Sequence, residues 1–262
     1  MESFPALVRQ FTIPLALEKH WRSFCEIGSQ RGNSADLLLG LDGVSVTIID
    51  PCLDIDLVRR YSTDSRVTVH QAISLDALPL VRGPFDCILI DGDHNWYTVY
   101  NELRLIRERE LLRPGGMIFL HDVSWPYGRR DMYYQPELIP AAHRHAYERK
   151  GIVAGRAELV DSGGANATLY NATHEGGRRN GVLTAIEDFI KEHRGDYCFW
   201  RVRRMHGMGM MQYRHRTLNG GLSFMALVGK AVRYDSHAAF DWLVKYWCPQ
   251  KSVAGDKNRI ES

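Results

Sequence analysis

The sequence has few cysteines, no long apolar run and little net charge, and each absence narrows what the protein can be. Its five cysteines are scattered without a Cys-x-x-Cys pair, which disfavours a zinc ribbon or a disulfide framework and favours a reducing compartment. No apolar run reaches the roughly 18 residues that a membrane-spanning helix needs. A formal net charge of +2 gives no reason to expect nucleic acid or an anionic membrane as partner. We therefore expect a cytoplasmic globular protein without nucleic-acid or membrane partners.

Short apolar strands alternate with helical segments over residues 23–122. This alternation is typical of a parallel sheet in an α/β fold with helices on both faces. The turn Pro114-Gly115-Gly116 is expected to lead into the fifth strand. Ser34 is expected to cap the helix that follows the first strand. A later helix should bury Val99 and its neighbours and leave Glu102 off the apolar face. The expected strands are 23–27, 44–50, 66–71, 85–90 and 117–120, followed by an antiparallel closing hairpin of 197–202 and 208–213.

The domain organisation follows from where this pattern breaks. Residues 123–181 are rich in glycine, tyrosine, arginine and histidine and have few periodic apolar positions, which indicates a lid or substrate-binding insertion. We expect one domain over residues 1–216 that contains this insertion, and a C-terminal extension over 217–262.

A glycine turn after the first strand indicates a nucleotide cofactor. A dinucleotide site needs the pattern G-x-G-x-x-G, and here the middle glycine is missing between Gly28 and Gly32, which makes a dehydrogenase a weak alternative. Glu26, two residues before the turn, suits a cofactor with a cationic amino-acid end, and Asp50 at the end of the second strand suits a ribose diol. Together they indicate S-adenosylmethionine (SAM). The expected cofactor-binding residues are Glu26, Gly28, Ser29, Gly32, Asp50, Ser74 and Asp91.

Further acidic and imidazole side chains gather where parallel strands end, which is where ligands of such sheets bind. These are Asp91, Asp93, His94, His121 and Asp122. Carboxylates brought together there would repel one another without a cation, and oxygen ligands suit Mg²⁺. The alternative is that Asp91 and Asp122 only cap the helices that follow them.

These motifs together resemble the class I SAM-dependent methyltransferases, over most of residues 20–215. The carriers are Glu26-Ile-Gly-Ser-Gln-Arg-Gly32, Asp50, the strand 85–91, the turn 112–116 and the closing hairpin. Asp91-Gly-Asp-His94 with His121-Asp122 is similar to the small-molecule O-methyltransferases grouped with macrocin O-methyltransferase and the cephalosporin-cluster methyltransferase-like proteins. The resemblance implies a Rossmann-like, mainly parallel seven-stranded sheet. Many of those relatives carry an acidic pair where this chain has His121.

The resemblance also implies roles for the site residues. A divalent metal, Mg²⁺ or another cation, would be held by Asp91, His121 and Asp122, with His121 either a ligand or an orienting residue. Asp93 matches the general-base position, and His94 is the competing candidate.

The implied reaction is O-methylation of a hydroxyl on a sugar or other secondary metabolite, such as an antibiotic precursor. The aromatic run 125–134 would contact this acceptor, or else form an ordinary surface loop. Metal-independent N-, C- or carboxyl-methylation and a non-catalytic cofactor-binding scaffold stay open as alternatives, as does assembly into a homo-oligomer.

Overall fold

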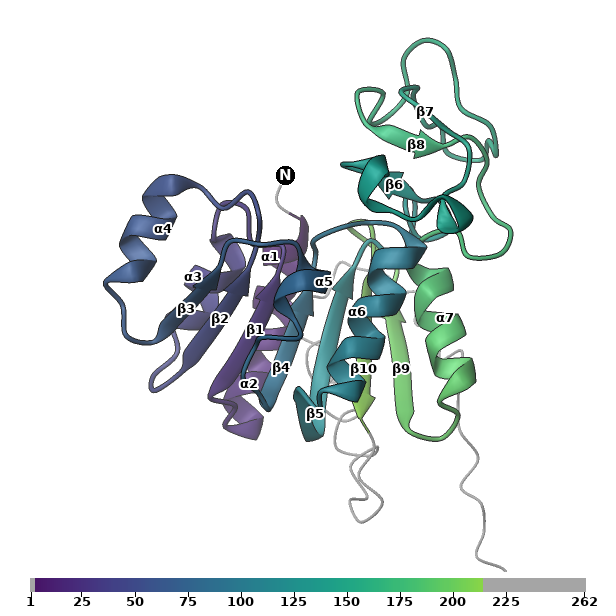
Figure 1. Ribbon diagram of the computed structural model, residues 1–262. Helices are drawn as coiled ribbons and strands as arrows, with labels where there is room; N and C mark the ends of the chain where they lie inside the picture. The colour runs from purple at the N-terminus through teal and green to yellow at the C-terminus, as the bar shows by residue number, and fades with distance from the viewer. Residues whose placement is uncertain (1–2, 214–262) are drawn as a thin grey trace, which may run out of the picture.

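The computed structural model describes residues 3–213, which are built around a seven-stranded sheet with the order β3-β2-β1-β4-β5-β10-β9 (Figure 1). Every neighbouring pair is parallel except those of β10, which runs antiparallel to β5 and to β9. The predicted fold, a mainly parallel Rossmann-like sheet with an antiparallel closing hairpin, is confirmed. The strands are β1 (Ser23–Ile27), β2 (Ser45–Ile49), β3 (Val67–His70), β4 (Phe85–Ile90), β5 (Leu112–His121), β9 (Tyr197–Val202) and β10 (Met208–Tyr213).

Helices cover both faces of this sheet, and each face has its own apolar core. One core packs α5, α6 and α7 against the sheet, and the other packs the N-terminal helices with α3 and α4 on the opposite face. In this part of the chain no helix is long and apolar enough to cross a membrane. The helices are α1 (Ser3–Leu7), the π-helix η1 (Val8–Thr12), α2 (Ile13–Lys19), α3 (Asn33–Leu39), α4 (Ile55–Ser62), α5 (Ser74–Ala77), α6 (Trp96–Glu108) and α7 (Val182–Glu192).

Three local expectations were wrong. The strand β5 begins at Leu112, because the Pro114–Gly116 segment is a bulge inside it: Leu112 pairs with Phe85 and Met117 already pairs with Cys87. Ser34 does not cap α3; Gly32 occupies the N-cap position without a side-chain bond.

Glu102 is the third. It lies fully buried on the inner face of α6, and its carboxylate has no hydrogen-bond partner among the described residues. Burial raises the pKa of Glu102 to about 8, so the neutral form enters the core at a lower cost than the charged form would.

The insertion forms a small unit of its own above the end of the sheet where α6 and α7 begin (Figure 1). It holds a three-stranded antiparallel sheet of the order β6-β8-β7 and two short 3-10 helices. Its own core is small, with Tyr127, Met132 and Ile152 at the centre. The elements are β6 (Met132–Tyr133), β7 (Tyr147–Glu148), β8 (Tyr170–Ala172), η2 (Pro136–Leu138) and η3 (Ala141–His143).

A buried carboxylate, Asp131, ties the insertion to the main sheet's helices. It is fully buried and accepts hydrogen bonds from the backbone N–H of Trp96 at 2.7 Å, the backbone N–H of Gly181 at 2.6 Å and the hydroxyl of Tyr133 at 2.9 Å. Trp96 begins α6 and Gly181 precedes α7, so one side chain satisfies donors at the starts of two helices. The position of the insertion is therefore fixed by polar contacts more than by its small apolar core.

Strand order places the ligand-binding edge of the sheet. The chain runs outward from β1 to β2 and β3, and then returns to pair β4 with the other side of β1. The direction of winding thus reverses between β1 and β4, and ligands of open α/β sheets bind beyond the carboxyl ends of the strands at such a reversal. The residues that follow β1, β2, β4 and β5 meet at this edge.

Candidate functional site

The turn after β1 is held in a fixed shape by Asp50. One Asp50 oxygen accepts the backbone N–H groups of Ser29 at 2.8 Å and Gln30 at 2.6 Å, and the other accepts that of Cys52 at 2.7 Å. Asp50 therefore orients the turn that follows β1. Two carboxylate oxygens offer about four acceptor positions, so these bonds leave room for one more donor.

Gly28 cannot be any other residue in this arrangement. Its φ is +83°, and a Cβ there would lie 2.3 Å from the main-chain oxygen of Asp91 and 2.4 Å from the Cα of Gly92. The turn after β1 and the segment after β4 thus pass in direct backbone contact. This contact joins the expected cofactor turn to the expected metal residues.

Glu26 lies beneath the same turn and is almost fully buried. Its carboxylate accepts a hydrogen bond from the Ser29 hydroxyl at 2.6 Å. Burial raises the pKa of Glu26 to about 8, and the nearby charges of Asp91 and Asp50 act in the same direction, against the hydrogen bonds from Ser29 and Ser34. A cationic group next to Glu26 would favour the ionised form, which is the chemistry expected of an ammonium ligand.

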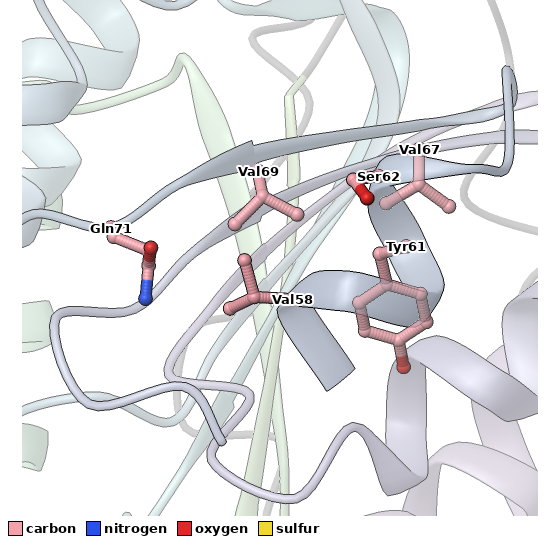
Figure 2. A pocket seen from close by; sticks show the side chains of 6 residues that line it. All are labelled: Val58, Tyr61, Ser62, Val67, Val69 and Gln71. Carbon is pink, nitrogen blue, oxygen red and sulfur yellow. The ribbon is translucent and has the colours of Figure 1, made fainter. Parts of the chain in front are cut away.

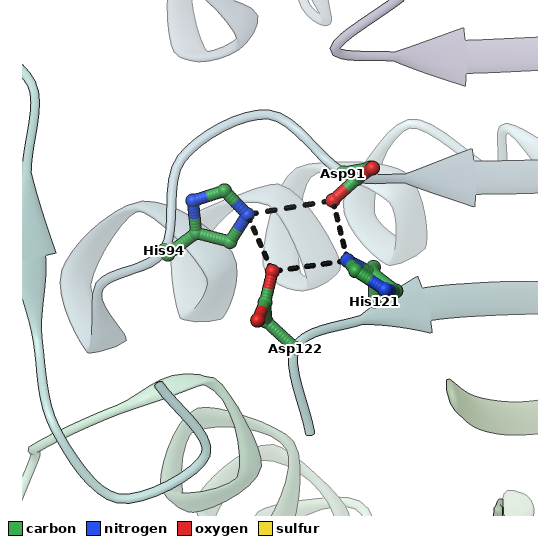
Figure 3. A group of neighbouring side chains, drawn as sticks. All are labelled: Asp91, His94, His121 and Asp122. Carbon is green, nitrogen blue, oxygen red and sulfur yellow. Dashed lines mark hydrogen bonds and ion pairs between the residues drawn. The ribbon is translucent and has the colours of Figure 1, made fainter. Parts of the chain in front are cut away.

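Four side chains converge beyond the ends of β4 and β5 (Figure 3). We call them the DHHD cluster: Asp91, His94, His121 and Asp122. One potential ligand atom from each lies within 4.8 Å of the others. Asp122 Oδ2 is 2.9 Å from His94 Nε2 and 3.0 Å from His121 Nδ1. Asp91 Oδ1 is 3.0 Å from His121 Nδ1 and 3.4 Å from His94 Nε2. The two carboxylates and two imidazoles alternate around a ring, with both kinds of ligand atom turned inward.

The electrostatics of the DHHD cluster couple its members strongly. Burial favours the neutral imidazole of His121, but Asp91 and Asp122 outweigh it and raise the pKa of His121 to about 10. The pKa of His94 is likewise raised well above its usual range by Asp122 and Asp91 in spite of burial. Burial alone would raise the pKa of Asp122, yet the two imidazoles hold it well below its usual range. The two carboxylates therefore favour the protonated form of both imidazoles, and a cation that shared their charge would weaken this effect.

Asp93 does not join the DHHD cluster. Its carboxylate accepts bonds from the backbone N–H of His94 at 3.1 Å, the Asn95 amide at 2.5 Å and the Thr98 hydroxyl at 2.8 Å. These partners lie at the start of α6, so the side chain supports the beginning of that helix. Burial raises the pKa of Asp93.

The other expected cofactor residue, Ser74, begins α5 and is buried. It follows β3 at the same edge of the sheet. The structure thus brings Asp91, His94, His121 and Asp122 together, keeps Glu26 and Asp50 at the neighbouring turn, and sets Asp93 apart from the DHHD cluster.

Two tyrosine rings of the insertion lie near the ring of His94. The Tyr127 ring stacks near it with a centroid separation of 5.7 Å, and the Tyr134 ring lies at 6.1 Å. Tyr134 is 56% exposed, whereas the Tyr127 hydroxyl is tied to Asn166 and Asn171 inside the insertion. Both tyrosines belong to the aromatic run 125–134, so the sequence did carry a signal for them.

Sequence reasoning missed the contacts that hold His121. Its Nε2 lies 3.0 Å from the main-chain oxygen of Met205, in the turn between β9 and β10, and the Phe4 ring packs at 5.0 Å from its ring. A main-chain carbonyl leaves no mark in the sequence, and Phe4 lies more than a hundred residues away along the chain.

A surface groove of about 290 Å³ lies elsewhere, between α4 and the edge strand β3 (Figure 2). Its lining contains no residue that the sequence singled out for the site, and three of the lining side chains are apolar: Val58, Val67 and Val69. The groove follows from an edge strand only partly covered by its helix.

No curated protein matches the sequence. Among solved structures, the SAH-bound methyltransferase PaMTH1 of Podospora anserina is 15% identical and aligns over 78% of this chain and 76% of its own, with a TM-score of 0.49. An O-methyltransferase of Bacillus cereus in complex with SAH is 18% identical over 81% and 80%, with a TM-score of 0.45. The O-methyltransferase TomG of Streptomyces achromogenes, involved in tomaymycin synthesis and solved with SAM, is 16% identical over 77% of each chain, with a TM-score of 0.44. We assign the fold from the strand order and not from these likenesses. A family model described as a methyltransferase domain matches residues 25–123, the stretch that runs from β1 to the residue after the DHHD cluster.

Proposed function

We propose that the protein is a SAM-dependent O-methyltransferase, assisted by a divalent cation, that methylates a hydroxyl of a small-molecule acceptor such as a sugar or another secondary metabolite. The observation that carries the proposal is the DHHD cluster beside the glycine turn, within the stretch that matches the methyltransferase domain. A methyltransferase site needs a place for the methyl donor and a place for a nucleophile, and these two features supply them side by side.

The donor side is formed by the turn after β1. SAM, when bound, supplies a methyl group activated on a sulfonium. We assign Glu26 to the ammonium of its amino-acid end, because this buried carboxyl has no cationic partner within residues 3–213 and is held in place by Ser29. Asp50 would accept a ribose hydroxyl, Gly28, Ser29 and Gly32 would line the cofactor, and Ser74 would lie near the adenine.

The cation side is formed by Asp91, His121 and Asp122. The site residues fit such an ion, because their ligand atoms already converge: Asp122 Oδ2 and Asp91 Oδ1 each lie 3.0 Å from His121 Nδ1. A divalent cation there would supply positive charge that favours ionisation of the acceptor hydroxyl. Asp91 would also face the donor, because the Gly28 turn touches its backbone.

His94 is the residue that we assign as the general base. Its Nε2 points into the DHHD cluster, whereas both Asp93 oxygens are occupied by donors at the start of α6. The rings of Tyr127 and Tyr134 lie near that of His94 and would position a ring-shaped acceptor. The insertion 123–181 is then the acceptor-binding part of the single domain that we propose for residues 1–216; the extension 217–262 lies outside the described residues.

Two measurements test this function. Calorimetric titration with SAH, with Mg²⁺ and again with chelator, should show micromolar binding in both conditions; no binding in either would remove the methyltransferase proposal. Transfer of labelled methyl from SAM to a panel of glycosides and phenols should then be lost in chelator and in Asp91→Ala, while Asp161→Ala, an exposed control in the insertion, retains it. Turnover of Asp91→Ala at the wild-type rate would contradict the role of the cation.

A further inference from the structure

The DHHD cluster differs from a magnesium site in its donor atoms. Two of its four inward ligand atoms are imidazole nitrogens, one from His94 and one from His121. Mg²⁺ prefers oxygen ligands and usually keeps several waters, whereas imidazole suits zinc, iron, nickel, copper and cobalt. The expected Mg²⁺ is therefore not the ion that best suits a site with His121 among its ligands, and His94, assigned above as the base, adds a second nitrogen beside that site.

His121 is held so that a particular nitrogen faces the site. Its Nε2 donates to the main-chain oxygen of Met205 at 3.0 Å, which leaves Nδ1 turned toward Asp91 and Asp122 at 3.0 Å from each. A hydrogen bond on one imidazole nitrogen fixes which nitrogen is free to bind a metal, and such outer contacts commonly orient metal-binding histidines.

The turn that supplies this carbonyl is itself tightly built. Met205, His206 and Gly207 all have left-handed φ values, and the His206 carbonyl accepts the backbone N–H of Ser124 at 2.7 Å. A Cβ on Gly207 would lie 2.4 Å from the Ser124 hydroxyl, so the turn is seated directly on the segment after β5. Backbone in sparsely populated conformations at this point is consistent with a site whose geometry is imposed by the fold.

Among the described residues, Nδ1 of His94 and Oδ1 of Asp122 are buried and have no hydrogen-bond partner, while Nε2 of His94 and Oδ2 of Asp122 face the other members of the DHHD cluster. Both side chains are about nine-tenths buried or more. A third imidazole stands close by, because Nδ1 of His206 is 3.9 Å from Asp122 Oδ1. The surroundings of the DHHD cluster are therefore rich in imidazole nitrogen.

We infer that the cation of this site is a first-row transition-metal ion and not Mg²⁺, and that His121 Nδ1 is the ligand that decides the selectivity. The inference rests on the proposed function, because it takes the DHHD cluster to be a cation site. It concerns His121 in particular, since a carboxylate at that position would turn the same edge of the sheet into an oxygen-dominated site suited to Mg²⁺.

The test compares Co²⁺ and Mg²⁺ binding to the metal-free full-length chain by calorimetry, with the visible absorption of bound Co²⁺ as a second readout. For the wild type we expect Co²⁺ to bind at least about 100-fold more tightly than Mg²⁺. In His121→Asp the Co²⁺ preference should fall by about tenfold or more, and the Co²⁺ spectrum should shift as a nitrogen ligand is replaced by oxygen. His174→Asp, which changes an exposed histidine of the insertion, should leave both readouts unchanged.

The possible outcomes separate the two proposals. Equal affinity for Co²⁺ and Mg²⁺ in the wild type, or an unchanged preference and spectrum in a folded His121→Asp variant, would overturn the selectivity and leave the cation-assisted reaction standing. If neither Co²⁺ nor Mg²⁺ binds, the cation is instead removed from the proposed function. Circular dichroism checks that His121→Asp is folded. The second variant, His121→Asn, lacks the imidazole and adds no charge, so it should lose Co²⁺ affinity without gaining Mg²⁺ affinity.

Discussion

Replacement of Asp131 should show that the insertion and the sheet unfold as one unit. In Asp131→Ala the backbone N–H groups of Trp96 and Gly181 lose their acceptor in a buried place, whereas the Tyr133 hydroxyl can rotate. Leaving a buried donor unpaired costs about 1–3 kcal/mol, so two such donors give an expected loss of about 4 kcal/mol. That loss corresponds to roughly a thousandfold change in the folding equilibrium.

Asp131→Asn is the matched variant, and it should behave differently. The same Asp131 oxygen, Oδ1, accepts both N–H groups, and an asparagine keeps an oxygen there. Burial raises the pKa of Asp131 to about 6, so the site does not favour the charge, and its removal should cost less than about 1 kcal/mol. Asp161→Ala, at an 89% exposed side chain of the insertion, should cost still less, despite its ion pair with Lys150.

Urea unfolding followed by tryptophan fluorescence and by far-ultraviolet circular dichroism provides the assay. Asp131→Ala should lower the midpoint of a single transition seen by both probes, with a free energy of unfolding about 4 kcal/mol below that of the wild type. The reasoning is refuted if Asp131→Ala unfolds like Asp161→Ala, or if Asp131→Asn is as damaged as Asp131→Ala.

Three other predictions address the site. Gly28→Ala should destabilise the chain by at least about 2 kcal/mol in urea unfolding, because the φ of +83° is unfavourable and the new Cβ meets the backbone of Asp91. If this variant unfolds like the wild type, the backbone contact between the turn after β1 and the segment after β4 is contradicted. Glu26→Gln should weaken SAH binding at least about tenfold by calorimetry. Since burial raises the pKa of Glu26 to about 8, wild-type SAH affinity should also increase from pH 6.5 to 8.5, and a flat profile would argue against the assigned ammonium contact. In chelator, the stabilisation from His121 should be complete below its unfolded pKa of about 6.5 and disappear as the pH rises through about 10, because its folded pKa is the higher one. Urea unfolding of His121→Asn should lack this decline, and a wild-type stability that is constant between pH 6.5 and 10 would count against it.

The parts of the fold with regular apolar periodicity could be predicted from the sequence. Phe85–Ile90 is a run of residues that only a strand buried on both faces would accommodate, and its predicted bounds are those observed. The bulge in β5 was mistaken for a turn because proline and glycine are typical of both, and only the partner strand decides between them.

Polar residues that the fold buries could not be placed in this way. Glu102, Arg130 and Asp131 are all fully buried, although each would normally be assigned to the surface. Arg130 is accommodated by main-chain carbonyls of Ala157 and Ala172, and Asp131 by main-chain N–H groups. Such main-chain partners are set by the path of the backbone and not by residue type, so a sequence pattern does not predict these buried hydrogen bonds.

The candidate site was predictable to the extent that strand ends are predictable. Asp91 and Asp122 directly follow strands, and parallel neighbours bring them to one edge. Which of Asp93 and His94 faces the site was not predictable, because the local turn decides the directions in which adjacent side chains of a loop point. Here that turn aims Asp93 at the start of α6 and His94 at the DHHD cluster.

The hydrogen bond between His121 and Met205 has a consequence for the order of assembly. The donor-side turn is complete once β1, β2 and β4 have paired, which needs only the first ninety or so residues. The orientation of His121, by contrast, depends on a carbonyl 84 residues further along, in the turn between β9 and β10, the last two strands of the sheet in sequence. If the proposed function holds, a folding chain should therefore acquire the proposed cofactor site before the proposed cation site. Metal affinity, followed during refolding, would time the docking of that hairpin.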